Sequence, residues 1–173
     1  MKTSHGTLVS VLSIAATVIA VDQLTKEIIV REIGPGAARR SIEIIPGFFH
    51  LTFVRNTGSA FGLFQGQSAI LTVLTIGAIV FLAAFYCRKA RHDSLVAIAL
   101  ALQLGGAIGN VIDRARYGYV VDFFDFPRWP TFNVADSAIT VGVVLLMYAL
   151  IFRDYEASEA KSERQLHSAG EDS

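Results

Sequence analysis

Charged residues are scarce in this sequence. Only 17% of its 173 residues are Asp, Glu, Lys or Arg, whereas 53% are hydrophobic and the mean hydropathy is +0.49. Soluble globular domains carry about 25% charged residues. The composition therefore excludes an ordinary soluble domain and predicts a small integral membrane protein. The formal net charge is zero, so we expect no nucleic-acid partner.

Cysteine is nearly absent, which excludes two further kinds of site. The only cysteine, Cys87, has no partner for an internal disulfide and cannot belong to a multi-cysteine metal site. It ends an apolar run, and we expect it to be a packing residue. His50 is a lone histidine and is more typical of a polar strand residue than of a ligand. Because the sequence has no His/Cys/Glu cluster, we predict neither a metal nor a cofactor.

Four apolar runs are long enough to cross a membrane, because a hydrocarbon core of about 30 Å needs roughly 20 helical residues. The first run also has the positive start of a cleaved signal peptide, and Val18-Ile19-Ala20 loosely fits a cleavage pattern. The residues that follow, DQLTK, are not a typical polar mature start, so a retained span is favoured. We expect spans at about 8–30, 69–87, 94–112 and 136–152.

The segment between the first two spans predicts a small β-hairpin. Ser41–Ile45 and Phe48–Val54 are rich in β-branched and aromatic residues, and Pro46-Gly47 supplies the centre of a tight turn between them. The predicted fold is an all-α integral membrane protein with four transmembrane helices and an extramembrane β-hairpin or sheet between helices 1 and 2. We expect residues 1–153 to form one domain and the polar residues 154–173 to form a disordered cytoplasmic tail.

Four spans place both termini on one side of the membrane, but the charge distribution does not decide which side. Seven Lys or Arg residues fall on each side. We favour cytoplasmic termini because Arg88, Lys89 and Arg91 directly follow a span, whereas several arginines on the other side lie in long or acid-containing segments.

The stretch from Gly105 to Asp136 concentrates acidic residues between two spans. A carboxylate in hydrocarbon costs roughly 3 kcal/mol even on lenient insertion scales, so such acids usually face a protein interior or a water-filled site. Two carboxyls that share one proton can hydrolyse a peptide bond, because one activates water while the other hydrogen-bonds the scissile carbonyl. The candidates near this membrane face are Asp22, Asp113, Asp122, Asp125 and Asp136.

Spacing alone does not select two of these acids. Asp113 precedes Arg114 and suits an ion pair. Asp136 could simply be the N-cap of the fourth helix. Asp22 and Lys26 lie four residues apart on one helix face and can pair, either as a surface ion pair or as a polar anchor that supports a site.

Five motifs occur in order along the chain. They are DQLTK at 22–26, NTGSAF at 56–61, GNVIDR at 109–114, VVDF at 120–123 and FNVADS at 132–137. Together they resemble the signature motifs of the lipoprotein signal peptidases, also called signal peptidase II, and the resemblance spans residues 8 to about 153. Each motif is weak alone, but five in this order on a four-span chain are highly specific.

The resemblance implies a membrane aspartic endopeptidase that removes the signal peptide from a diacylglyceryl-modified prolipoprotein by cutting just before the lipidated cysteine. It assigns the catalytic dyad to Asp122 and Asp136. It also implies a monomer that contacts membrane lipids in the bacterial cytoplasmic (inner) membrane, with the active site at the outer, periplasmic face. An extramembrane β-cradle and a lid-like helix would fall within 31–67. Further positions that support the site or contact substrate are Asp22, Lys26, Asn56, Asn110, Asp113, Arg114 and Asn133.

Two other functions could use the same acids. A small ion-coupled transporter would need polar residues through its spans, but the second span has only threonines and the fourth little beyond Thr140. The sequence also lacks the internal repeat typical of many transporters. A non-enzymatic assembly subunit would keep its function after charge-neutral substitution of both aspartates.

Overall fold

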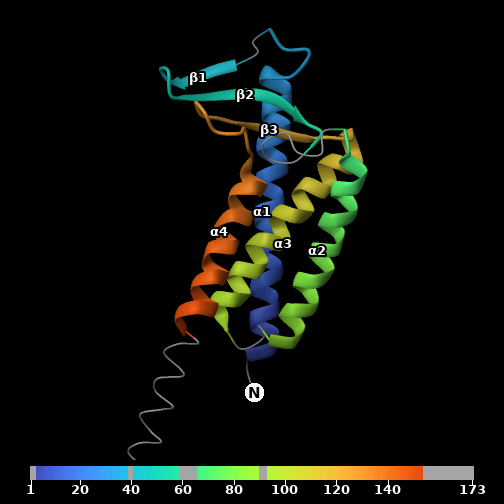
Figure 1. The fold of residues 1–173 in the computed structure, drawn as a ribbon, viewed down its shortest axis with the longest axis vertical. Helices are drawn as coiled ribbons and strands as arrows, with labels where there is room; N and C mark the ends of the chain where they lie inside the picture. The colour runs from blue at the N-terminus through green and yellow to red at the C-terminus, as the bar shows by residue number, and fades with distance from the viewer. Residues whose placement is uncertain (1–2, 39–40, 59–65, 90–92, 154–173) are drawn as a thin grey trace, which may run out of the picture.

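The structure is a computed structural model, and it describes residues 3–38, 41–58, 66–89 and 93–153 (Figure 1). Within this part of the chain, four helices are long and apolar enough to cross a membrane, which confirms the predicted span number. The expected disordered tail lies outside the described residues, and so do residues 39–40 and 59–65 of the segment in which a lid-like helix was expected. The helices are α1 (Thr3–Ile33), α2 (Ser68–Lys89), α3 (Ser94–Tyr117) and α4 (Val134–Tyr148), and α4 continues as a π-helix, η3 (Ala149–Arg153).

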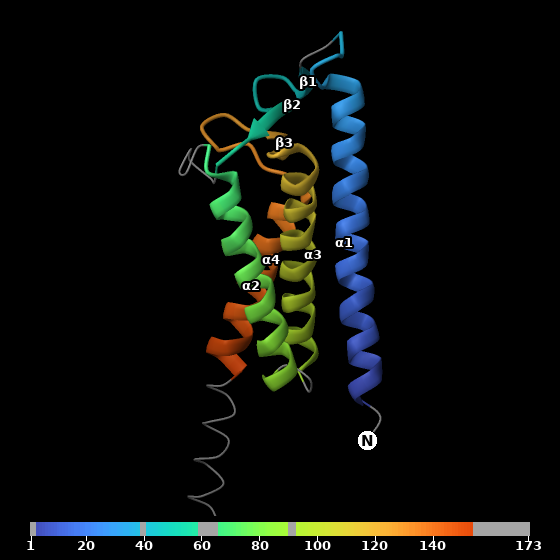
Figure 2. The same ribbon diagram turned by 90° about the vertical axis from the view of Figure 1, so that its right-hand side faces the viewer.

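The helix α3 lies at the centre of the bundle, with α1 on one side and α2 and α4 on the other (Figure 2). It packs against all three of these helices, and most of its apolar length is buried. In contrast, α2 packs mainly against α3, and none of its apolar window is fully buried; Leu82 and Phe85 are half-buried, whereas Val73 and Phe81 are exposed. Lipid is as apolar as these side chains, so their exposure carries no penalty in a membrane.

Glycines on α3 permit its close contacts with two neighbours. A Cβ atom on Gly105 would lie 2.9 Å from the main-chain oxygen of Ala15 on α1. A Cβ atom on Gly106 would overlap the main-chain oxygen of Ala135 on α4. The absence of a side chain at both positions therefore lets three helix backbones approach one another directly.

The helix α3 is longer than the apolar pattern predicted. It continues past residue 112 to Tyr117, and its end is capped by Gly118 in the left-handed conformation (φ 77°). The Gly118 N–H donates to the main-chain oxygen of Arg114 at 3.0 Å. The polar residues that end the apolar run are thus still helical, because a glycine and not polarity terminates this helix.

The extramembrane sheet has three antiparallel strands in the order β1 (Ser41–Ile45), β2 (Phe49–Asn56) and β3 (Val120–Asp125). The hairpin of β1 and β2 confirms the prediction, since the Phe48 N–H donates to the Ile45 oxygen at 3.0 Å and Gly47 has a φ of 67°. The third strand was not predicted. Its first four residues are all buried, so it lacks the alternation of a half-exposed strand.

The sheet lies across one end of the bundle, and the described chain ends lie at the other (Figure 1). Val121 and Phe123 of β3 are buried against Ile29 and Ile33 of α1. This apolar cluster fixes the sheet on the helices and places Asp122, between its two β3 members, at the end of the bundle.

The structure excludes one alternative and contradicts one expectation. The N-cap of α4 is Asn133, and Asp136 is the third residue of the helix, paired with Asn133 in a capping box. Cys87 is exposed on α2 and does not pack inside the protein. In agreement with prediction, His50 is a strand residue, and its Nε2 lies 3.3 Å from Glu43 Oε1 on the neighbouring strand.

Candidate active site

The strand β3 carries Asp122, whose side chain is only 1% exposed. Its Oδ1 accepts a hydrogen bond from Asn133 Nδ2 at 2.7 Å, and its Oδ2 accepts one from Asn56 Nδ2 at 2.8 Å. The Oδ1 of Asn56 accepts from the Gly58 N–H at 2.9 Å, which fixes the orientation of that amide. Both carboxyl oxygens of Asp122 therefore face amide donors.

The capping box of α4 places Asp136 next to this group. Asn133 Oδ1 accepts from the Asp136 N–H at 2.9 Å, and Asp136 Oδ2 accepts from the Asn133 N–H at 3.3 Å. Because its oxygen is engaged by the helix, the amide nitrogen of Asn133 is directed to Asp122. One asparagine thus joins the first turn of α4 to β3.

Asn110 on α3 holds the other side of Asp136. Its Nδ2 donates to Asp136 Oδ1 at 2.8 Å, and its Oδ1 accepts from Lys26 Nζ at 3.0 Å and from Asn133 Nδ2 at 3.3 Å. A lysine ammonium can only donate, so it fixes the Asn110 amide with its NH₂ group toward Asp136. The amides of Asn110 and Asn133 therefore connect the two carboxyls.

Lys26 lies at the centre of a buried charge cluster. Its Nζ is 2.9 Å from Asp22 Oδ2 and 2.9 Å from Asp113 Oδ2, and the three side chains are 3%, 0% and 1% exposed. The predicted pair of Asp22 and Lys26 is confirmed, and it is buried, not on the surface. Asp113 pairs with Lys26, so its expected pairing with Arg114 is wrong.

The acids of this cluster also bind main-chain groups of the site. Asp22 Oδ1 accepts from the Ala135 N–H at 3.0 Å, and Asp113 Oδ2 accepts from the Val121 N–H at 3.0 Å. Ala135 and Val121 directly precede the two candidate aspartates. The charge cluster therefore determines the position of the backbone that carries Asp136 and Asp122.

Gln23 is a site residue that the sequence analysis did not single out. Its Nε2 contacts Asp113 Oδ1 at 3.0 Å, Asp22 Oδ2 at 3.2 Å and the main-chain oxygen of Gly109 at 3.2 Å. In the sequence, the only indication of such a role was that Gln23 follows Asp22 in the DQLTK motif. The side chain donates to Asp113 Oδ1 and adds a second donor at Asp22 Oδ2, which Lys26 also contacts.

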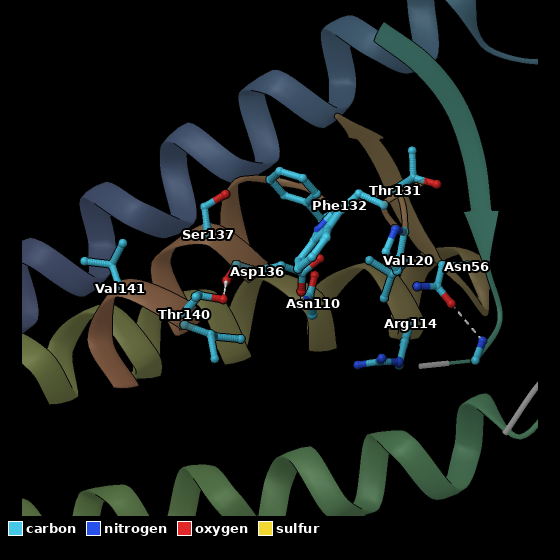
Figure 3. A pocket seen from close by; sticks show the side chains of 14 residues that line it. Asn56, Asn110, Arg114, Val120, Thr131, Phe132, Asp136, Ser137, Thr140 and Val141 are labelled. Carbon is cyan, nitrogen blue, oxygen red and sulfur yellow. Dashed lines mark hydrogen bonds between the residues drawn. The ribbon is translucent and has the colours of Figure 1, made fainter. Parts of the chain in front are cut away.

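A cavity of about 670 Å³ lies beside the paired carboxyls (Figure 3). Asp136 lines it, whereas Asp122 is not among its lining residues. Arg114 also lines it, and the buried Nε of this arginine has no hydrogen-bond partner among the described residues. The walls combine polar groups with apolar side chains, including Asn56, Asn110, Trp129, Phe132, Ser137, Thr140 and Val141.

Burial makes the carboxyl group of Asp122 a weaker acid than usual. Loss of solvent, followed by the nearby charge of Asp136, raises the pKa of Asp122 to about 7, although hydrogen bonds from Asn56 and Asn133 act in the opposite direction. Two carboxylates whose charges interact cannot both ionise cheaply, so such a pair titrates as a unit. The site can therefore hold one proton near neutral pH, which is the condition for acid–base catalysis.

The described residues contain no group of three or more His, Cys, Asp or Glu side chains placed to hold a metal ion. The acids of the site are engaged instead by Lys26 and by asparagine amides.

Four apolar helices and two amide-connected carboxyls at one end of the bundle define a multi-pass membrane protein with a buried pair of aspartates. The family model described as Signal peptidase (SPase) II matches residues 14–152. This chain therefore belongs to the signal peptidase II family, and it is an aspartic-type signal peptidase. The family assignment favours the enzyme over the transporter and the assembly subunit.

Individual relatives agree with this assignment. The lipoprotein signal peptidase of Moorella thermoacetica is 43% identical over 140 residues, which cover 81% of this chain and 91% of the relative. That of Syntrophotalea carbinolica is 48% identical over 146 residues, covering 80% and 88%. The chain is thus similar to bacterial enzymes over nearly their full length, in agreement with a multi-pass protein of the bacterial inner membrane.

Two solved structures share the fold. Both are bacterial membrane enzymes determined by the in meso method, one at 2.3 Å and one at 1.9 Å resolution. The first has a TM-score of 0.75 at 37% identity and covers 82% of this chain and 87% of its own. The second has a TM-score of 0.73 at 37% identity and covers 83% and 93%.

Proposed function

We propose that this enzyme removes the signal peptide from prolipoproteins whose cysteine carries diacylglycerol, and that it cuts just before that cysteine. The names of the relatives support the substrate class. The observation that carries the proposal is the pair Asp122 and Asp136, whose carboxyls are connected through the amides of Asn110 and Asn133 beside the cavity.

The proposed reaction needs one proton on the pair. One carboxylate takes a proton from water as the water oxygen attacks the scissile carbonyl carbon, and the other carboxyl donates its proton to the carbonyl oxygen. The carboxyl that took the proton from water then donates it to the leaving nitrogen as the C–N bond breaks, and the other, now a carboxylate, takes a proton from a hydroxyl of the tetrahedral intermediate. The products are the carboxyl end of the signal peptide and the free amino group of the lipidated cysteine, and the pair again holds one proton.

The hydrogen bonds favour Asp136 as the initial holder of the shared proton. Both oxygens of Asp122 accept short bonds from amides, at 2.7 and 2.8 Å, as suits an anion. In contrast, Asp136 Oδ2 accepts only the 3.3 Å bond from the Asn133 N–H. In this proposal, Asp122 is the base toward water, and its pKa of about 7 suits that role.

The other site residues have two roles in this proposal. Asn56 and Arg114 line the cavity and would hydrogen-bond the extended backbone of the substrate. The Nε of Arg114, which has no acceptor among the described residues, supports this role, because leaving a buried donor unpaired costs about 1–3 kcal/mol. The residues that hold the paired carboxyls in place are Asp22, Lys26, Asn110, Asp113 and Asn133.

We also propose how the enzyme sits in the membrane. Residues 1–153 would act as one domain and as a monomer, with cytoplasmic termini and the active site at the periplasmic face. The sheet lies at one end of the bundle and the described chain ends lie at the other, which supports this orientation (Figure 1). Thr140 and Val141 of the span α4 line the cavity, so a substrate with a membrane helix and two acyl chains could reach it sideways from lipid.

Cleavage of a diacylglyceryl-modified prolipoprotein in detergent tests the dyad. We expect Asp122→Asn and Asp136→Asn to lose about 10³-fold or more in rate, because each removes a proton-transfer group. Asp125→Asn is the matched control, since Asp125 lies on the same strand but bonds Thr52 at 3.0 Å, outside the pair. Thermal melts would show that all variants fold. Activity that survives in either dyad variant would mean that the wrong carboxyls were chosen, and Asp113 and Asp22 would be tested next.

A further inference from the structure

Two arginines at the sheet end of the bundle have no acidic partner among the described residues. Arg55 lies on β2 and Arg116 lies in the last turn of α3, and both side chains are exposed. The hydrogen-bond partner of Arg116 is neutral, the Oε1 of Gln23 at 3.5 Å. Arg31 at the same end behaves differently, because it pairs with Glu27 at 2.9 Å.

The two guanidinium groups lie on aromatic rings. Arg116 Cζ is 5.1 Å from the ring centroid of Tyr117, and Arg55 Cζ is 5.3 Å from that of Tyr119. The two tyrosine rings stack on each other at 5.8 Å with an interplanar angle of 26°. A guanidinium group above an aromatic ring has further N–H groups at its edge, and two adjacent N–H groups match two oxygens of a phosphate. These four residues form the arginine–tyrosine cluster.

The cluster lies where the chain leaves the membrane. Tyr117 is the last residue of α3, Gly118 caps the helix, and Tyr119 directly precedes β3. Tyrosine is enriched at the level of lipid headgroups, and basic residues there interact with lipid phosphates. Two positive charges without a carboxylate partner favour an anionic lipid over a zwitterionic one.

We propose that the arginine–tyrosine cluster binds the headgroup of an anionic phospholipid, such as phosphatidylglycerol. The bound lipid holds β2 and β3 at the membrane surface. Arg55 directly precedes Asn56, whose amide donates to Asp122 at 2.8 Å. The lipid thereby stabilises the strands that position the site, without taking part in cleavage.

Native mass spectrometry of the full chain in detergent, with phosphatidylglycerol or phosphatidylcholine added, tests this binding independently of activity. We expect the wild type to prefer phosphatidylglycerol. Arg55→Gln and Arg116→Gln should each weaken its binding about fivefold, and the double variant about 25-fold, from the usual contribution of one basic residue at an anionic surface. The matched control, Arg31→Gln, should change it less than about twofold, because Arg31 is already paired with Glu27.

Several outcomes would overturn the proposal. Equal binding of the two lipids by the wild type would do so, and so would an equal loss in Arg31→Gln. Competition by glycerol phosphate, which has no acyl chains, would show that the cluster takes free phosphate instead of lipid. If the double variant does not fold, the lipid preference of the wild type is measured at low salt and at 1 M salt. A preference for phosphatidylglycerol that 1 M salt leaves unchanged does not come from exposed charges and would overturn the proposal.

Discussion

The helices α2 and α3 are both apolar enough to span a membrane, yet they have opposite surroundings. Most of the apolar window of α3 is buried, whereas none of that of α2 is. The buried residues of α3 are mostly small or polar, such as Gly106, Asn110 and Asp113, while α2 exposes large side chains such as Val73 and Phe81. Large apolar side chains can face lipid. The protein interior is therefore occupied by small residues, which let helix backbones approach closely, and by polar residues, which are costly in lipid.

The two ends of the bundle also differ in their buried groups, which are charged at one end and apolar at the other. The buried charged side chains of the described residues are Asp22, Lys26, Asp113 and Asp122. They lie at the sheet end, because Asp122 is on β3, Asp113 accepts from the Val121 N–H of β3, and Lys26 pairs with Asp113 and Asp22. Each of them is paired or hydrogen-bonded, because an unpaired charge in this setting would strongly destabilise the fold. The far end is held mainly by apolar contacts of α2, α3 and α4. Substitutions should therefore have their largest effects around α3 at the sheet end.

The largest loss of stability is expected for Lys26→Met. This substitution leaves Asp22 and Asp113 buried without their cation, and breaking such a pair costs about 3–5 kcal/mol. It also releases the Asn110 amide that holds Asp136. Thermal melts and cleavage assays should show both losses, and Lys26→Arg, which keeps the charge, should lose less. A Lys26→Met protein that melts like the wild type would contradict the central role of this cluster.

Activity should fall by about tenfold for each pH unit below about 7, because Asp122 must be ionised to act as the base. Stability should change in the opposite sense. The folded-state pKa of Asp122 is raised, so its contribution to stability is fully present below its unfolded pKa and is lost as the pH rises through about 7.

Rate profiles and thermal melts between pH 5 and 8 measure both effects. Asp125→Asn should keep the wild-type rate profile. The melting temperature of Asp122→Asn should depend less on pH than that of the wild type. A rate that stays constant down to pH 5 would contradict the proposed base.

The smallest expected effect comes from glycine substitutions, which compare α3 with α2 directly. Gly106→Ala should destabilise by about 1–3 kcal/mol, because its Cβ would overlap the Ala135 oxygen of α4. Gly77→Ala in α2 meets open space and should be neutral or stabilise by up to about 1 kcal/mol. Thermal melts of both proteins measure the difference. Equal melting temperatures would show that an added methyl group is accommodated equally well on α3 and on α2, which would contradict the expected close packing of α3.

The sequence predicted features that depend on neighbouring residues. The four spans follow from long apolar runs, and the hairpin follows from Pro46-Gly47 between two β-prone segments. The pair of Asp22 and Lys26 follows from helical spacing. β3 was missed because it is buried and does not alternate. Gln23 was missed because two of its three acceptors, the Gly109 oxygen and Asp113 Oδ1, lie on α3 and not on its own helix.

By itself, the sequence determined a four-span membrane protein with several acids near one face, because hydrophobic length and turn chemistry act locally along the chain. Only the tertiary structure decided which acids are joined by amides, since Asn110, Asn133 and Asp122 come from α3, the start of α4 and β3. It likewise decided that Asp113 pairs with Lys26 on α1 and not with its neighbour Arg114. A buried carboxyl takes the donors that packing brings within about 3 Å, and sequence distance does not report that geometry.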